Sequence, residues 1–314
     1  MTWRPDLASV PFSAHPLLDR DGSMWNFGAV GLMGGSGLMV WHLGADGKLV
    51  SGDILETPIR GYLHSFAMTD RHLVFVLIPF RYRQGEGAFF ERLRFQPDQS
   101  LRIAVVPKDA PASARWFEAD FAAIYHFGDA CERNGRIVMR AIQHQDIEEA
   151  RSPMRAAMSG QAQAHGGEGV LRELHLDLRS GKAHWRDTGI AGIEFPLFDP
   201  RSRGDRGARI FAPTVEGAHS APYFNAVAAF DVERGRRQVH RYGETILAEE
   251  HVFVPRPGSS RSGDGWLVGT LLDSARGRSG IAVLDAQRIE QGPLAQAWLP
   301  HTVPLGFHGH FASR

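Results

Sequence analysis

Apolar residues along this chain come in short runs that are separated by turn residues. Pairs typical of tight turns, Asp21-Gly22, Asp46-Gly47, Asn134-Gly135 and Ser180-Gly181, lie between the runs. Such spacing favours β-hairpins over helices. The strands expected on this basis cover residues 23–30, 37–43, 73–80, 136–142, 170–178, 225–232, 265–272 and 280–286.

Many short strands at roughly ten-residue spacing imply a sandwich, a barrel or a propeller. No WD or kelch repeat is visible, so any propeller blades have diverged in sequence. Apolar and polar residues alternate over 171–178, which predicts an outer strand with one face in water, and Ser180-Gly181-Lys182 then turns into residues 183–185. The one plausible helix covers 145–159 and is followed by a glycine-rich loop. Since no linker divides the sequence, we expect residues 1–314 to form a single domain.

Composition narrows the class of protein. The 314 residues contain 35 Lys plus Arg and 35 Asp plus Glu, so no net charge favours a nucleic acid or an anionic membrane as partner. Cys131 is the only cysteine, which rules out an intrachain disulfide and favours a reducing compartment. The sequence begins without a signal-peptide pattern and contains no run of eighteen apolar residues. We therefore expect a soluble, cytoplasmic protein with no transmembrane segment.

Four of the fifteen histidines lie in distinctive contexts beside expected strand ends: His15, His64, His126 and His308. They are separated by 49, 62 and 182 positions, far too many for a zinc finger, so only a large fold could bring them to one point. Imidazole suits iron, copper, nickel and zinc, whereas magnesium and calcium prefer oxygen ligands. The alternative is that each is an ordinary hydrogen-bonded histidine of the core or rim.

Six segments, four of which contain these histidines, resemble, in order, those of the carotenoid cleavage oxygenase family, which includes retinal pigment epithelium isomerohydrolase and the lignostilbene dioxygenases. The resemblance runs from about residue 11 to residue 311. The segments are SAHPLLDRDGSMWNFG, LHSFAMTDRHLVFVLIPF, YHFGDACERNGRIVM, IEFPLFDPRSRG, HVFVPRPG with DGWLVGTLLDSARGRSGIAVLDA, and LPHTVPLGFHGHF.

The resemblance implies an all-β, seven-bladed β-propeller with a non-haem ferrous ion, Fe(2+), on its axis. The four histidines match the family's iron ligands. Glu194 and Glu250 match glutamates that accept the ligands' other N–H groups and thereby fix the imidazole tautomer. Without the family, Glu194 would be a carboxylate that is costly to bury unless paired, and Glu250 would be a surface charge at a strand end.

The sequence also departs from the family pattern. Only fourteen residues precede His15, whereas family members usually have well over a hundred, including a third such glutamate. We therefore expect the C-terminal two-thirds of a family member and an incomplete propeller, an open arc or a smaller ring. Ser65 stands where the family often has Asp, and Asp129 where Asn is common. Cys131 is interpreted as a small buried apolar residue.

The function implied by the resemblance is an iron(II) dioxygenase that cleaves a carbon–carbon double bond of an apolar polyene or a stilbene-type substrate to two carbonyl products. Its partners would be an apolar small molecule and dioxygen. Phe66, Phe127 and Phe307 are candidates for the lining of an apolar channel, or equally for plain core packing. A non-catalytic propeller remnant or binding scaffold and a structural zinc site remain as alternatives. The choice of substrate and the oligomeric state stay open.

Overall fold

The computed structural model describes residues 9–32, 35–147, 155–156, 159, 169–205, 207–217 and 223–311. Strands dominate this part of the chain, and each of the eight predicted strands is confirmed to within two residues at either end. The helix predicted over 145–159 lies mostly outside the described residues, as does the loop after it. Within the described residues, no helix is long and apolar enough to cross a bilayer. Short 3-10 turns are η2 (Phe89–Arg92), η3 (Pro200–Ser202) and η4 (Ile289–Gln291).

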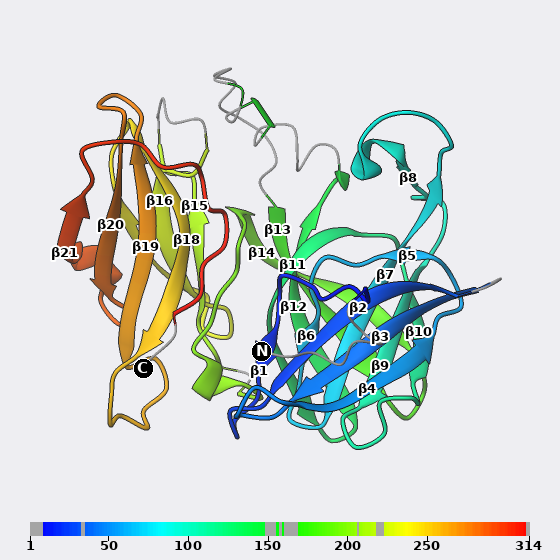
Figure 1. The fold of residues 1–314 in the computed structure, drawn as a ribbon. Coiled ribbons are helices and arrows are strands. Elements are labelled where there is room, and N and C mark those ends of the chain that lie inside the picture. Colours follow the sequence, from blue (N-terminus) through cyan, green and yellow to red (C-terminus); the bar gives the residue numbers. More distant parts are fainter. Residues whose placement is uncertain are drawn as a thin grey trace. The chain divides into compact units, whose positions relative to one another are not determined.

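The first sheet is a four-stranded antiparallel meander, blue in Figure 1. Its strands, in order, are β1 (Leu17–Leu18), β2 (Met24–Leu32), β3 (Gly35–Leu43) and β4 (Leu49–Glu56). The β2–β3 register runs from Met24 opposite Leu43 to Leu32 opposite Gly35. Alternate side chains such as Trp25, Phe27 and Leu38 are buried in one core cluster, and Met39 and Trp41, which alternate with Leu38 along β3, are buried in another, so β3 is covered on both faces.

The second sheet is built around β7, which is buried from Leu73 to Ile78. The strands are β5 (Gly61–Tyr62), β6 (Ala67–Met68), β7 (His72–Tyr82), β8 (Leu93–Phe95), β9 (Leu101–Pro107) and β10 (Arg115–Ala119). The main path is β10-β9-β7-β5, with β6 and β8 also paired to β7. A continuous apolar run is typical of such a fully buried strand. His64 lies in an irregular segment that precedes the two-residue strand β6.

The third sheet follows the order β11 to β17. Its strands are β11 (Ala123–Arg133), β12 (Arg136–His144), β13 (Gly169–Asp177), β14 (Ala183–Ile193), β15 (Ile210–Thr214), β16 (Ala226–Asp231) and β17 (Arg236–Arg241). Asn134 and Gly135, with φ of 53° and 72°, form the predicted two-residue turn between β11 and β12. In β13 the predicted alternation is interrupted, because Glu173 is buried as an ion-pair partner of Arg140 at 3.3 Å.

The fourth sheet is antiparallel in the order β18-β19-β20-β21, yellow to red in Figure 1. Its strands are β18 (Ile246–Pro255), β19 (Gly265–Asp273), β20 (Arg278–Asp285) and β21 (Pro293–Trp298). The β18–β19 register shifts between Ala248 and His251. Ala248 faces Leu271 and His251 faces Gly269, so two residues of β18 stand opposite Thr270 alone. This is a β-bulge, which changes the direction in which side chains project from the strand.

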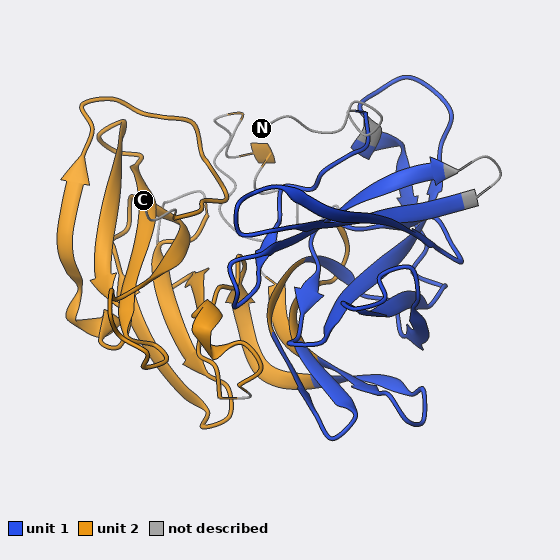
Figure 2. Ribbon diagram, turned by 60° about the horizontal axis from the view of Figure 1, so that its bottom comes forward, with its two compact units in different colours: residues 1–125, 130–139, 174–186 blue, residues 126–129, 140–173, 187–314 orange. Residues whose placement is uncertain are grey.

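The chain divides into two compact units, coloured blue and orange in Figure 2. Unit 1 contains residues 1–125, 130–139 and 174–186, and unit 2 contains residues 126–129, 140–173 and 187–314. Each unit has its own buried apolar clusters. In unit 1 the main cluster includes Phe66 and Phe75, and in unit 2 two clusters are formed around Phe211 and Ile193.

Candidate metal centre

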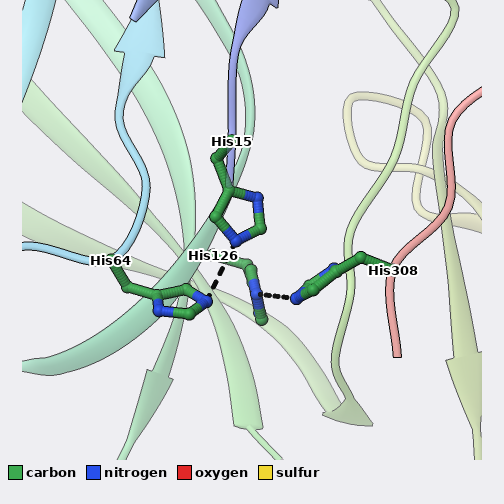
Figure 3. A group of neighbouring side chains, drawn as sticks. All are labelled: His15, His64, His126 and His308. Carbon is green, nitrogen blue, oxygen red and sulfur yellow. Dashed lines mark hydrogen bonds between the residues drawn. The ribbon is translucent and has the colours of Figure 1, made fainter. Parts of the chain in front are cut away.

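His15 and His64, two of the four predicted ligands, meet in unit 1. Their Nε2 atoms are 3.0 Å apart, and their rings are tilted by 57° with centroids 4.6 Å apart. Figure 3 shows the two rings pointing toward each other, joined by a dashed line. The structure thus brings together two side chains that are 49 positions apart in the sequence.

The segment that carries His15 is fixed to β2 by Asn26, which is fully buried. The Ser13 hydroxyl donates to Asn26 Oδ1 at 2.5 Å, and Asn26 Nδ2 donates back to the Ser13 carbonyl at 2.9 Å. The backbone N–H of Ser13 bonds to Phe27, and the N–H of His15 bonds to the Ser13 hydroxyl. Pro16 follows and favours an extended conformation at His15. The imidazole therefore projects from a segment with little freedom.

His64 is held from its other ring nitrogen. The Tyr62 hydroxyl lies 3.1 Å from His64 Nδ1, and the Tyr125 ring meets the imidazole edge-on at 5.3 Å. Ser65, at the position where Asp is common in the family, is buried and donates to the Tyr125 carbonyl at 2.6 Å. Ser65 thus anchors the segment through the backbone next to His64.

His126 and His308 form the corresponding pair in unit 2. Their Nε2 atoms are 3.2 Å apart, and the rings meet edge-on with centroids 4.7 Å apart, as the second dashed line in Figure 3 shows. His126 lies within β11 and not at a strand end as predicted, whereas His308 lies in the irregular segment after β21. The two residues are 182 positions apart in the sequence.

Glu194 holds His126 from behind and is itself 3% exposed. Its Oε2 lies 2.6 Å from His126 Nδ1, its Oε1 lies 2.7 Å from His144 Nε2, and the backbone N–H of Phe195 donates to it. Burial alone would raise the pKa of Glu194, but the charge and hydrogen bonds of His126 and His144 outweigh burial, and its pKa lies well below the usual range. Glu194 is therefore an ionised acceptor, which puts the proton of His126 on Nδ1.

The other predicted glutamate lies beside His308. Glu250 Oε1 is 3.6 Å from His308 Nδ1, and Glu250 Oε2 accepts the backbone N–H of Gly309 at 2.7 Å. Its side chain is 9% exposed, so it is not the surface charge that the sequence alone suggested. Glu250 is one of the two residues in the bulge of β18.

Apolar rings border the His126–His308 pair. The Phe195 ring lies 5.0 Å from His126 and 5.2 Å from His308, and both Phe195 and Phe307 adopt positive φ, 51° and 59°. With Tyr223 these rings line a small apolar cavity of about 20 Å³, which has room for little more than a water molecule. Phe66, by contrast, packs in the core of unit 1. Of the three candidate lining residues, Phe307 alone is found in this cavity wall.

Three residues that support the candidate ligands were not predicted from the sequence. Tyr62 contacts His64, His144 contacts Glu194, and Glu249 contacts the backbone just before His308. His144 is the last residue of β12 and is buried against Glu194. Its neighbours gave no distinguishing signal, because the partner lies 50 positions away. Tyr62 is close in sequence to His64, and Glu249 is next to Glu250. This closeness to a predicted site residue is the signal that could have found them.

The distances within each pair fit neighbouring ligands of a metal ion. Two nitrogens bound at about 2.1 Å and at a right angle are about 3.0 Å apart. The pairs show 3.0 Å for His15–His64 and 3.2 Å for His126–His308. A direct hydrogen bond between two imidazoles spans the same distance. The protonation state of the rings therefore decides whether a pair is hydrogen-bonded or can bind a metal. A neutral His126 that donates from Nδ1 to Glu194 has its lone pair on Nε2, the form that a metal requires.

Comparisons with known proteins point to one family. The model of the Retinal pigment epithelial membrane protein family matches residues 2–313. The apocarotenoid-15,15'-oxygenase of Synechocystis sp. is 25% identical over 326 residues, which cover 96% of this chain and 63% of that protein. The resveratrol cleavage oxygenase 1 of Aspergillus fumigatus is 26% identical, covering 96% of this chain and 65% of its own length. The isoeugenol monooxygenase of Pseudomonas nitroreducens is 24% identical, with 98% and 67% covered.

Solved structures give the same answer for the fold. The crystal structure of cobalt-substituted Synechocystis apocarotenoid oxygenase superimposes with a TM-score of 0.84 at 23% identity, over 97% of this chain and 65% of that one. The match confirms the predicted all-β fold of the carotenoid oxygenase propellers. The chain spans less than two thirds of the length of this relative.

Proposed function

The chain belongs to the Retinal pigment epithelial membrane protein family of carotenoid cleavage oxygenases, and from this premise we propose that it acts as a non-haem iron(II) dioxygenase. The reaction would be oxidative cleavage of a carbon–carbon double bond to two carbonyl products. The observation that supports it most directly is the pairing of His15 with His64 and of His126 with His308 through Nε2 atoms at ligand spacing. We propose that the two pairs supply one ligand set of four imidazoles.

The donor set favours iron over the hard cations. Four neutral imidazole nitrogens suit iron, copper, nickel or zinc and not magnesium or calcium. When bound, a ferrous ion would supply the redox chemistry with dioxygen, which protein side chains cannot perform. The residues around the ligands have a separate task. They orient the imidazoles so that the nitrogen lone pairs face the ion, and they exclude water.

Polar partners behind the ligands fix the tautomers. Glu194 holds the proton of His126 on Nδ1, and the Tyr62 hydroxyl is placed to do the same for His64. Glu250 lies 3.6 Å behind His308 and bonds the next backbone amide. Such partners orient a ligand and raise its basicity, so that Nε2 faces the metal.

The apolar rings beside the ligands suit an apolar substrate. Phe195 contacts both His126 and His308, and it is buried. Phe rings at this position would exclude water and offer a surface to a conjugated chain or an aromatic ring. The relatives are named for an apocarotenoid, resveratrol and isoeugenol. All three classes of compound contain a double bond conjugated to a polyene or to a phenol ring.

Metal analysis and product analysis test the proposal. The full chain is purified under nitrogen, incubated with ferrous iron, freed of excess metal and assayed for bound iron. We expect one iron per chain, and we expect a His→Ala change at any of His15, His64, His126 and His308 to lower that content. His301→Ala is the matched control, because His301 is exposed and outside the ligand set.

The loaded protein is then given oxygen and a panel of apocarotenals, resveratrol and isoeugenol. Aldehyde products that carry oxygen from labelled dioxygen are expected from at least one of these classes. Wild-type protein that holds no iron would favour the binding scaffold, and tight zinc without oxygen uptake would favour a structural site. Either result overturns the proposed reaction.

A further inference from the structure

Two adjacent carboxylates of β18, Glu249 and Glu250, both contact the segment that carries His308. Neighbouring residues of a regular strand point to opposite faces of the sheet. Here the bulge between Ala248 and His251 places both residues opposite Thr270. The extra residue changes the direction in which the side chains project, so that both carboxylates reach residues 306–309.

Glu249 contacts this segment through the backbone and not through the imidazole. Its Oε1 accepts the N–H of Gly306 at 2.7 Å and that of Phe307 at 3.1 Å. Its Oε2 accepts the Thr270 hydroxyl at 2.7 Å, which ties the carboxylate to β19. Hydrogen bonds to an ionised acceptor are stronger than those between neutral groups. One side chain thus connects the sheet to two consecutive amides just before His308.

The segment needs such an anchor. Residues 302–311 have no regular secondary structure, and Phe307 adopts a φ of 59°, a conformation that non-glycine residues rarely occupy. A strained backbone of this kind persists only where the surroundings hold it. The bonds from Gly306 and Phe307 to Glu249 fix the two peptide groups that immediately precede the Phe307 Cα. The conformation at Phe307 in turn sets the direction in which His308 projects.

We propose that Glu249 is a positioning residue that clamps the Gly306–Phe307 backbone and so holds His308 in the direction required of a metal ligand. The coupling to metal binding rests on the proposed function, whereas the clamp itself does not. Glu249 and Glu250 then have different tasks. Glu250 lies behind the imidazole and accepts the amide that follows His308, whereas Glu249 fixes the two amides that precede it.

Hydrogen exchange in the metal-free protein tests the clamp. We expect Glu249→Ala to raise the exchange rate of the Gly306 and Phe307 amides by about 10-fold or more, since each loses a charge-assisted bond. The amides of β19 and β20 should keep their wild-type rates. Glu249→Gln retains an acceptor oxygen and should fall between the two, so it tests the proposal even if the alanine variant folds poorly. Thr270→Val leaves the carboxylate in place and should have a smaller effect.

Metal affinity tests the consequence. Binding of cobalt(II) is followed by its absorption spectrum in competition with a chelator. Changing an outer partner of a ligand typically lowers metal affinity by about 10- to 100-fold, and we expect about 10-fold for Glu249→Ala. Glu290→Ala, at an exposed carboxylate of η4, is the matched control.

The two proposals fail separately. If wild-type protein binds no metal, the proposed function is wrong, and the exchange rates still decide on the clamp. If wild-type protein binds metal and Glu249→Ala matches it in both exchange and affinity, Glu249 is not a positioning residue. Faster exchange at Gly306 and Phe307 with unchanged affinity would overturn the link to His308.

Discussion

Glu194 Oε1 and His144 Nε2 lie 2.7 Å apart in the interior of unit 2, and both side chains are almost fully buried. The other oxygen of Glu194 bonds to His126, so one carboxylate joins a candidate ligand to a second histidine behind it. A buried carboxylate is costly unless each oxygen has a donor. His144 supplies one of these donors and so keeps Glu194 ionised and oriented toward His126.

Loss of His144 is therefore expected to weaken metal binding, although it does not touch the proposed ion. His144→Phe keeps a ring and removes the donor to Glu194. We expect metal affinity to fall about 10-fold, at the lower end of the range for outer partners of a ligand. Loss of this bond to a buried charge should also cost about 1–3 kcal/mol of stability. Chelator competition and urea unfolding measure the two effects.

His144→Gln is the matched variant, because its amide can donate to the same oxygen. We expect affinity close to wild type. If His144→Phe also bound metal as tightly as wild type, the link through Glu194 would be excluded.

The Tyr62 hydroxyl is expected to matter in the same way for His64. Tyr62→Phe removes the group 3.1 Å from His64 Nδ1 and leaves the ring. A phenol is a weaker acceptor than a carboxylate, so we expect the loss of metal affinity to be severalfold and smaller than for Glu194→Gln. The cobalt absorption spectrum should change as the His64 tautomer becomes less well fixed. Tyr82→Phe, at an exposed tyrosine of β7, should leave both readouts unchanged.

The strands and turns were predictable from the sequence because their signals are local, whereas the propeller fold was predicted from the family resemblance. Runs such as residues 73–80 are apolar over the length of one strand, and pairs such as Asn134-Gly135 require the positive φ that the turn shows. Cys131 was also predicted correctly as buried. The prediction failed at Glu173, because the alternating pattern carries no information about Arg140, 33 positions away.

The candidate site was predictable as far as the family resemblance reached. His15, His64, His126 and His308 were identified by their flanking residues, and their pairing is a property of the fold. His144 could not be found in this way, because nothing near it in the sequence distinguishes it from the other histidines. The same holds for Glu249, whose contacts depend on a β-bulge that leaves no recognisable pattern in the sequence.

Gly269 is expected to be required for the packing of β18 on β19. A Cβ at this position would lie 2.4–2.5 Å from ring atoms of His251. That ring cannot move away easily, because it is buried and bonded to the Tyr242 hydroxyl at 2.7 Å and to the Glu249 carbonyl at 2.8 Å. We therefore expect Gly269→Ala to destabilise the protein by about 1–3 kcal/mol.

The urea midpoint measures this effect, with Gly31→Ala as control, since a Cβ at Gly31 meets nothing within 4 Å. Equal midpoints for the two variants would show that the His251 ring moves away from the added Cβ without loss of stability.

The stability of unit 2 should depend on pH through Asp129. This carboxyl is 2% exposed and accepts two hydrogen bonds from Arg140 Nη1, at 2.9 and 3.0 Å. Burial raises the pKa of Asp129 to about 6 and outweighs the opposite effect of Arg140. In the unfolded chain an aspartate has a pKa of about 3.9. Between these values the folded state binds more protons, so the contribution of Asp129 to stability is present at about pH 4 and is lost as the pH rises through about 6.

Asp129→Asn removes this titration and retains an acceptor for Arg140. When this difference in proton binding is integrated from about pH 4 to about pH 6, the wild-type protein should lose about 2 kcal/mol more than the variant. Urea unfolding of both proteins across this range measures the difference, and groups common to both cancel. Parallel pH profiles would mean that Asp129 stays ionised beside Arg140 throughout, with the guanidinium outweighing burial.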